Sequence, residues 1–210
     1  MVYLYVADVT QLPERETDLQ KYLSKERIQK LEKQKNVNRR KQILGAGLLL
    51  EKVLKLYGVS QDNVTIGQNG KPEAEGICFN LSHSGNFVVC AVSDKPVGCD
   101  VEKIRKASEK IAERHFCESE NIYLKTCDSN KYDEEFFRFW TVKESYLKMT
   151  GEGLKVPLRE VEVILAEEVK VLRSGMLQQC FIKEYRIPEY QITVCAEEQE
   201  FSSLLLMQLH

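Results

Sequence analysis

The sequence predicts an α+β fold in which a long helix followed by a β-hairpin occurs twice. Helical periodicity and segments of alternating apolar residues support this order. The helices are expected at roughly 37–57 and 131–150, and the hairpins at 77–92 and 180–196. Gly58 and Gly151 are the predicted helix stops. The hairpins close on Val89-Cys90-Ala91 and Val194-Cys195-Ala196, 105 residues apart. Chance matching is the alternative explanation of these three shared residues.

Composition bounds the possible classes of protein. With 210 residues the chain can form one large domain or two small ones, and 43% hydrophobic residues suffice for a sizeable core. A net charge of −2 argues against a nucleic-acid binder. The seven cysteines form no Cys-x-x-Cys pair and no signal peptide is recognised, which favours reduced thiols in a cytoplasmic protein. The longest apolar run, 43–50, is too short to span a membrane.

Charged residues interrupt the apolar face of the second predicted helix. Glu144 and Lys148 lie one turn apart at the edge of an apolar stripe, and Lys143 falls inside it. The stripe consists of Phe136, Phe139, Trp140, Tyr146 and Leu147. An ordinary amphipathic helix is the simpler interpretation. Its Glu–Lys pair would contribute only about 0.2–0.5 kcal/mol, and Lys143 would snorkel to the surface.

An acidic pair lies on a predicted strand at 97–102. Apolar and polar residues alternate there, so Asp100 and Glu102 project from the same face. Adjacent carboxylates repel each other, and hard Mg²⁺ takes oxygen ligands that a substrate phosphate often completes. A strand with a solvated acidic face is the alternative.

A polar segment separates two apolar runs at 79–92. Ser82-His83-Ser84-Gly85 is expected to form a turn whose hydroxyls, imidazole and backbone N–H groups can hold phosphate oxygens. The alternative is an ordinary turn, since Ser and Gly are common turn residues. The histidines and cysteines have no zinc-ligand spacing, so a zinc site is not expected.

Taken together and in this order, five motifs resemble those of the Sfp-type (surfactin-synthetase-activating) 4′-phosphopantetheinyl transferases. They are Gly70-Lys71-Pro72, Asn80 to Gly85, Gly98 to Glu102, Trp140 to Lys148, and Gly151 to Leu154. Two departures are small. Cys99 replaces the usual aliphatic residue, and the segment 73–75 lacks an apolar residue often found there. Neither departure removes a chemical group.

The resemblance implies two similar α/β halves related by a pseudo-twofold axis. The halves would be residues 1–95, which contact nucleotide phosphates, and 96–210, which carry the metal and catalytic carboxylates. They would form one structural unit with the site between them. A pseudo-dimer of this kind is expected to act as a monomer.

The resemblance also implies a reaction. The 4′-phosphopantetheine arm of coenzyme A moves to a serine of an acyl or peptidyl carrier protein, and adenosine 3′,5′-bisphosphate leaves. Asp100, Glu102 and Glu144 are the implied Mg²⁺ ligands. One of these carboxylates, or a water that it holds, would serve as base for the serine hydroxyl, with Glu144 favoured, and Lys148 is expected to contact a phosphate oxygen and steady the leaving group.

The phosphates of coenzyme A require cations away from the metal. The residues that the resemblance implies for these contacts are Arg27, Lys30, Lys71, Ser82, His83 and Lys148. Arg27 and Lys30 are i,i+3 neighbours on one predicted helix face. One of Arg39, Arg40 and Lys41 is also expected to face the nucleotide, with Arg40 or Lys41 favoured.

The segment 103–116 is the expected surface for the carrier protein. It is rich in Lys and Arg, and Ile104, Ile111 and Phe116 would anchor an acidic helix of the partner. The alternative is an amphipathic helix that covers the sheet.

Two other functions fit part of the pattern. An Asp-x-Glu pair with a downstream Lys-Glu also occurs in Mg²⁺-dependent nucleases, but the near-neutral charge argues against a DNA-binding groove. A non-catalytic module that binds coenzyme A or carrier protein is the other possibility, although the complete set of carboxylates and lysines argues against it.

Overall fold

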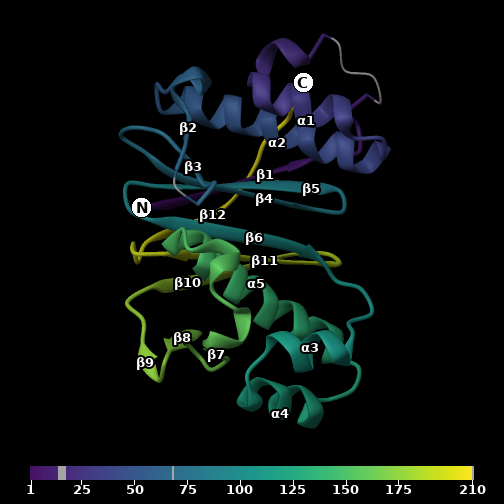
Figure 1. Cartoon of the computed structure of the whole chain (residues 1–210), viewed down its shortest axis with the longest axis vertical. Coiled ribbons are helices and arrows are strands. Elements are labelled where there is room, and N and C mark those ends of the chain that lie inside the picture. The colour runs from purple at the N-terminus through teal and green to yellow at the C-terminus, as the bar shows by residue number, and fades with distance from the viewer. Residues whose placement is uncertain (14–17, 68, 210) are drawn as a thin grey trace.

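Two β-sheets pack against each other at the centre of the molecule, and helices cover their outer sides (Figure 1). The structure is a computed structural model that describes residues 1–13, 18–67 and 69–209. The first sheet has the order β12-β1-β5-β4 and the second has the order β10-β11-β6. Their strands are β1 (Val2–Asp8), β4 (Cys78–Ser84), β5 (Phe87–Ser93), β6 (Val97–Lys103), β10 (Phe181–Ile187), β11 (Tyr190–Ala196) and β12 (Phe201–Leu206).

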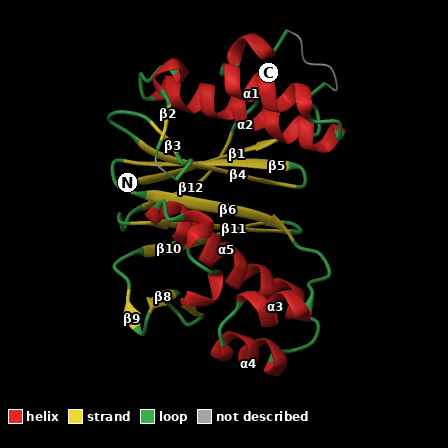
Figure 2. Ribbon diagram, viewed as in Figure 1, coloured by secondary structure: helices red, strands yellow, loops and turns green. Residues whose placement is uncertain are grey.

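The described residues form five α-helices besides the sheets, and Figure 2 shows them on the two outer sides. They are α1 (Lys25–Lys33), α2 (Val37–Leu56), α3 (Glu109–His115), α4 (Glu118–Thr126) and α5 (Tyr132–Thr150). Short strands form two smaller sheets: β2 (Thr65–Ile66) with β3 (Pro72–Glu73), and β7 (Val161–Ile164) with β8 (Lys170–Arg173) and β9 (Met176–Leu177). Short 3₁₀ turns lie at Gln20–Tyr22, Gln61–Asn63, Gly153–Lys155 and Leu158–Glu160.

The predicted helices and hairpins are confirmed. The Asn36 side chain accepts a hydrogen bond from the Arg39 backbone N–H and so caps the start of α2. Helix α5 ends at Gly151, whose φ of +72° is a left-handed conformation that glycine adopts without strain. Strands β4 and β5 form the first hairpin and β10 and β11 the second. The predicted α+β class is therefore confirmed.

Alternation along the strands divides the core into three layers. In β1, Val2, Leu4 and Val6 point into the space between the sheets. Tyr5 and Ala7 point the other way, toward α2. The third layer lies between the second sheet and helices α3, α4 and α5. A period of two thus lets each sheet bury both faces.

The division of the chain at residues 95 and 96 stays a prediction. Strand β6 begins the second half and joins β11 in the second sheet. The final strand, β12, returns to the first sheet and pairs in parallel with β1. The C-terminal strand therefore ties the two sheets together.

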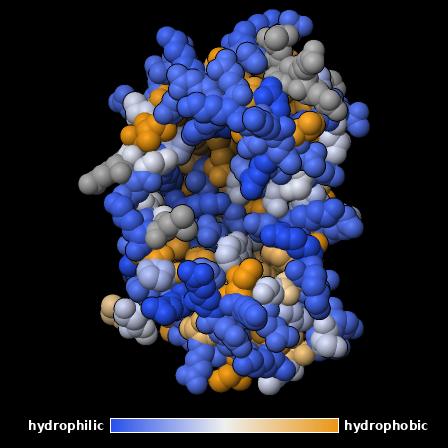
Figure 3. Space-filling model, turned by 45° about the vertical axis from the view of Figure 1, so that its right-hand side comes forward, coloured by the Kyte–Doolittle hydropathy of each residue, from blue (hydrophilic) through white to orange (hydrophobic). Residues whose placement is uncertain are grey.

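One face of the protein is largely polar and its cysteines are unpaired, as the composition predicts. The face in Figure 3 is mostly hydrophilic, with hydrophobic side chains in separate patches. All seven cysteines are free thiols. Among the described helices, none is long and apolar enough to cross a membrane.

Candidate active site

The predicted polar turn at 82–85 is largely strand. Ser82, His83 and Ser84 are the last residues of β4, and Ser84 pairs with Phe87 across a two-residue turn. The expectation of a phosphate-binding turn was therefore wrong in its local structure. These polar residues extend the strand because it lies beside β6, where their side chains have hydrogen-bond partners. As a consequence, the serines and His83 project from opposite faces of β4.

Strand β6 carries the predicted acidic pair on one face, as its alternation indicates. Val97, Cys99 and Val101 pack between the sheets. Asp100 lies on the opposite face, which α5 covers. A Cβ atom added to Gly98 would clash with backbone atoms of Ser145 and Met149, because it would approach them to well under 3.0 Å. It would also lie 2.9 Å from the Lys148 carbonyl carbon. Glycine at this position thus lets the α5 backbone rest directly on β6.

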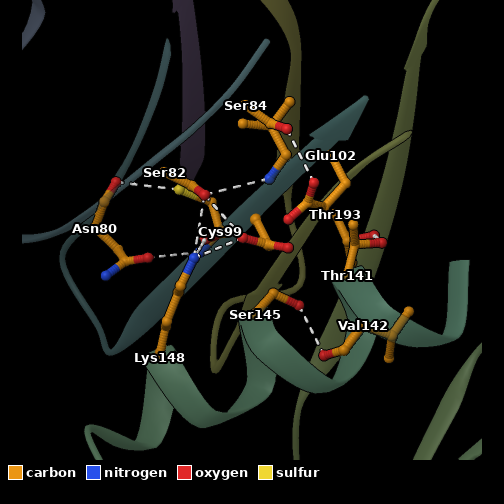
Figure 4. A network of polar contacts seen from close by, with 12 residues as sticks. Asn80, Ser82, Ser84, Cys99, Glu102, Thr141, Val142, Ser145, Lys148 and Thr193 are labelled. Atoms are coloured by element: carbon orange, nitrogen blue, oxygen red, sulfur yellow. Dashed lines mark hydrogen bonds and ion pairs between the residues drawn. The ribbon is translucent and has the colours of Figure 1, made fainter. Parts of the chain in front are cut away.

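This close approach brings Lys148 onto Asp100. The Lys148 Nζ lies 2.6 Å from Asp100 Oδ1, and it also donates to Ser82 Oγ at 3.1 Å and to the Cys99 carbonyl at 3.2 Å (Figure 4). The Ser82 hydroxyl in turn donates to Asp100 Oδ1 at 2.8 Å. Burial disfavours the charged form of Lys148, yet Asp100, with Cys99 and Glu144 adding to its effect, raises the pKa of Lys148 above its ordinary value.

Two further carboxylates sit in the field of Asp100. The Ser84 hydroxyl donates to Glu102 Oε2 at 2.9 Å, and the Arg105 guanidinium donates to the same oxygen at 3.2 Å. Burial, followed by the charge of Asp100, raises the pKa of Glu102. Burial also raises the pKa of Glu144, with Asp100 adding to the effect and Lys148 opposing it. Burial and the nearby Asp100 thus both disfavour the charged forms of Glu102 and Glu144.

Such a cluster suits a divalent cation. Asp100 is only 4% exposed, and its Oδ2 is buried without a hydrogen-bond partner, which leaves an oxygen available to a ligand. Carboxylate oxygens are the ligands that Mg²⁺ takes. Over the described ranges 1–13, 18–67 and 69–209, no three acidic, His or Cys side chains already form a metal-binding group. A cation bound at Asp100 would therefore need oxygen ligands from a substrate besides these side chains.

A second polar cluster lies on the other face of β4. His83 is buried enough that its Nδ1 has no hydrogen-bond partner. Burial, and then the charge of Arg39, lowers the pKa of His83, with Lys148 and Arg27 adding to the effect. An imidazole with an unused nitrogen, in the field of Arg39 and Arg27, is suited to an anion. Arg39, from the start of α2, is the member of its basic run that lies close enough to act on His83.

The remaining predicted phosphate ligands are engaged elsewhere or exposed. Arg27 donates to the Ile43 carbonyl at 3.4 Å, and burial lowers its pKa. Lys30 is exposed on α1. Arg40 donates to the carbonyls of Leu31 and Gln34 at the end of α1. Its role toward a nucleotide stays a prediction.

Lys71 also forms an internal contact. Its Nζ donates to the Val97 carbonyl at 3.1 Å and to the Met149 carbonyl at 3.3 Å, near the C-terminal end of α5. A cation there interacts favourably with the helix dipole. Burial lowers the pKa of Lys71. The residue therefore joins the segment before β4 to both β6 and α5.

Lys143 does not snorkel, contrary to expectation. It is fully buried, and its Nζ pairs with Glu120 Oε2 at 2.8 Å. It also donates to the carbonyls of Leu158 and Val161. Glu120, from α4, accepts from the Val163 N–H at 2.7 Å. A buried ion pair thus joins α5 to α4 and β7, and Glu120 with the two carbonyl groups compensates the desolvation of the Lys143 ammonium group.

The basic segment 103–116 only partly matches its predicted role. Helix α3 spans only Glu109–His115, and Ile111 is 44% exposed. Phe116 is buried against Phe136 and Phe139, so it cannot be a surface anchor as expected. Its aromatic partners lie on α5, outside the reach of any local pattern.

Residues beyond the predicted set also shape the site. Asn80 and Gly98 belong to the quoted motifs without a role predicted from the sequence, and Ser84 was expected to hold phosphate oxygens, not Glu102. The alternation of Asn80, Ser82 and Ser84 is a period-two signal that could have placed them on one strand face. Nothing in the local sequence links Arg105 to Glu102 beyond their spacing.

Comparison with known proteins agrees with this geometry. The family profile of the 4′-phosphopantetheinyl transferase superfamily matches residues 96–195. The 4′-phosphopantetheinyl transferase Sfp of Bacillus subtilis is 31% identical over 173 residues, 79% of this chain and 77% of the relative. The 4′-phosphopantetheinyl transferase ffp of Bacillus subtilis is 31% identical over 206 residues, 93% of this chain and 92% of the relative.

A solved structure gives a weaker likeness. A holo-(acyl-carrier-protein) synthase of Bacillus anthracis, in complex with CoA (3′,5′-ADP), is 20% identical. It covers 50% of this chain and 96% of its own, with a TM-score of 0.42. The assignment to a family does not rest on this alignment.

The sequence relatives define a class of enzymes, the phosphopantetheinyl transferases. The chain belongs to the 4′-phosphopantetheinyl transferase family, and the resemblance to its Sfp-type members is confirmed.

Proposed function

We propose that this enzyme transfers the 4′-phosphopantetheine arm of coenzyme A to a serine of an acyl or peptidyl carrier protein. The carrier serine oxygen forms a bond to the phosphorus that bears the arm. The bond from that phosphorus to the bridging pyrophosphate oxygen breaks, and adenosine 3′,5′-bisphosphate leaves with the electron pair. The observation that supports this most is the cluster of Asp100, Glu102, Glu144 and Lys148 where α5 rests on β6.

Asp100, Glu102 and Glu144 would hold Mg²⁺. When bound, the cation neutralises charge on the pyrophosphate oxygens. The buried, unpartnered Asp100 Oδ2 and the raised pKa values of Glu102 and Glu144 support this assignment. Glu144 is the proposed base for the carrier serine, because a carboxylate with a raised pKa accepts a proton more readily at neutral pH.

Lys148 is the proposed contact to a phosphate oxygen. The Asp100 carboxylate stabilises its charge, so Lys148 stays a cation beside the acidic cluster. Ser82, which bridges Lys148 and Asp100, would act by holding both groups in place.

The cations around His83 are the proposed site of the 3′-phosphate. Arg27 and Arg39 supply the positive charges, His83 offers a ring nitrogen without a partner, and Lys30 lies one turn from Arg27 on α1. In this arrangement residues 1–95 would bind the nucleotide phosphates, and residues 96–210 would carry the reacting groups. The enzyme would act as a monomer in the cytoplasm, where its seven free thiols stay reduced.

A carrier-protein assay tests the proposal and both alternatives. Apo carrier protein is incubated with the enzyme, coenzyme A and Mg²⁺, and the intact mass of the carrier is measured. We expect conversion to the holo form with the wild type and none with Asp100→Ala. Coenzyme A binding without conversion would favour a non-catalytic module. Cleavage of plasmid DNA in Mg²⁺ without conversion would favour a nuclease.

A further inference from the structure

Side chains, instead of backbone groups, join β4 to β6. The two strands belong to different sheets but run side by side in the same direction. Asn80 Oδ1 accepts from the Cys99 N–H at 2.9 Å, Ser82 Oγ from the Val101 N–H at 3.4 Å, and Ser84 Oγ from the Lys103 N–H at 3.1 Å. Every second residue of β4 thus satisfies every second N–H of β6. Figure 4 shows Asn80, Ser82 and Ser84 beside β6. This polar ladder fixes the register of one sheet against the other.

Both serines of the ladder also donate to an acidic residue of β6. The Ser82 hydroxyl donates to Asp100 Oδ1 at 2.8 Å, and the Ser84 hydroxyl donates to Glu102 Oε2 at 2.9 Å. A hydroxyl has one proton to donate. Because each oxygen already accepts from a backbone N–H, its proton is directed at the carboxylate. The same side chain therefore sets both the strand register and the carboxylate orientation.

We propose that Ser84 is a positioning residue for Glu102, and that this is how the first half of the chain sets the cation site of the second. The inference rests on the proposed function. Ser84 fixes Oε2 of Glu102 together with Arg105, so the carboxylate presents its other oxygen in one orientation. Arg105 alone is a weak restraint, because its side chain is 63% exposed.

Three variants distinguish a role of Ser84 in orienting Glu102 from a role in stabilising the fold alone. Ser84→Ala removes the donor to Glu102 and the acceptor for the Lys103 N–H. Ser84→Thr keeps the hydroxyl on a β-branched residue that suits a strand. Ser145→Ala is the matched control. It removes a buried hydroxyl that bonds only to the Val142 carbonyl of its own helix.

The test is a calorimetric titration of Mg²⁺ into each folded protein with adenosine 3′,5′-bisphosphate present. We expect Ser84→Ala to weaken Mg²⁺ binding about 10–100-fold, while Ser84→Thr and Ser145→Ala bind as the wild type does. Transfer assays should show a matching rise in the Mg²⁺ concentration needed by Ser84→Ala, with the KM for coenzyme A little changed.

Wild-type Mg²⁺ affinity in Ser84→Ala would overturn the inference. If Ser84→Ala does not fold, Ser84→Cys serves instead, because a thiol is a weaker donor; unchanged affinity in that variant would also overturn it. Failure of the proposed function gives a different result: the wild type then transfers nothing at any Mg²⁺ concentration, while the calorimetric comparison still reports on Ser84.

Discussion

Replacing Gly98 with alanine should separate α5 from β6. The added Cβ would lie far closer than 3.0 Å to backbone atoms of Ser145 and Met149, and backbone cannot turn aside as a flexible side chain can. Helix α5 must therefore retreat by about 1 Å, a displacement that costs about 10²-fold in rate when it moves catalytic groups. That loss corresponds to about 2.7 kcal/mol in the activation barrier. Overpacking of the core should also destabilise the fold by about 1–3 kcal/mol.

The assay must distinguish lost stability from a displaced site. The control is Gly45→Ala, whose Cβ would also overpack, but against Val9 and Leu12 in the first half of the chain. Urea unfolding and kcat/KM for carrier modification are measured for both variants. We expect both to be destabilised and only Gly98→Ala to lose activity while folded. Wild-type kcat/KM in folded Gly98→Ala would refute the claim that this close approach builds the site.

Four further predictions test separate parts of the account. Lys143→Met should destabilise the protein by about 3–5 kcal/mol, because it leaves Glu120 charged and buried; a urea-derived loss below about 1 kcal/mol would contradict this. Because the folded state lowers the pKa of His83 below 6.5, its native state binds fewer protons than the unfolded state. Wild-type stability should therefore fall relative to His83→Asn as pH drops below 6.5, whereas parallel curves would exclude this effect. Adenosine 3′,5′-bisphosphate should raise the His83 pKa in an NMR titration. Since all assigned contacts lie at the nucleotide end, acylated coenzyme A should react within about tenfold of the free thiol, about 1.4 kcal/mol, and a larger drop would show that the thiol end is enclosed.

Periodicity predicted the elements that local sequence controls. The alternation at 97–102 correctly placed Asp100 on the face opposite Val97, Cys99 and Val101, because side chains of a strand alternate whatever lies around them. The apolar stripe likewise predicted helix α5, and Gly151, which adopts a left-handed conformation, predicted where the helix ends.

Long-range partners account for what the sequence missed. Ser82 and Ser84 look like turn residues, but hydrogen bonds to a strand some 19 residues away keep them in β4. Lys143 looks like a surface residue, and only the position of Glu120 on another helix explains its burial. Phe116 is removed from the surface by aromatic rings of α5. None of these partners can be inferred from a local window.

The central claim is that the Asp100 carboxylate is needed for transfer and not for nucleotide binding. Its most direct test measures carrier modification and nucleotide binding in the Asp100→Asn variant. This substitution keeps the size of the side chain and removes the charge that secures Lys148 and would bind Mg²⁺. The measurement is the intact mass of apo carrier protein after incubation with coenzyme A and Mg²⁺, alongside binding of adenosine 3′,5′-bisphosphate to the same variant. The account predicts a folded protein that still binds the nucleotide but leaves the carrier unmodified. Conversion of the carrier at the wild-type rate would contradict it.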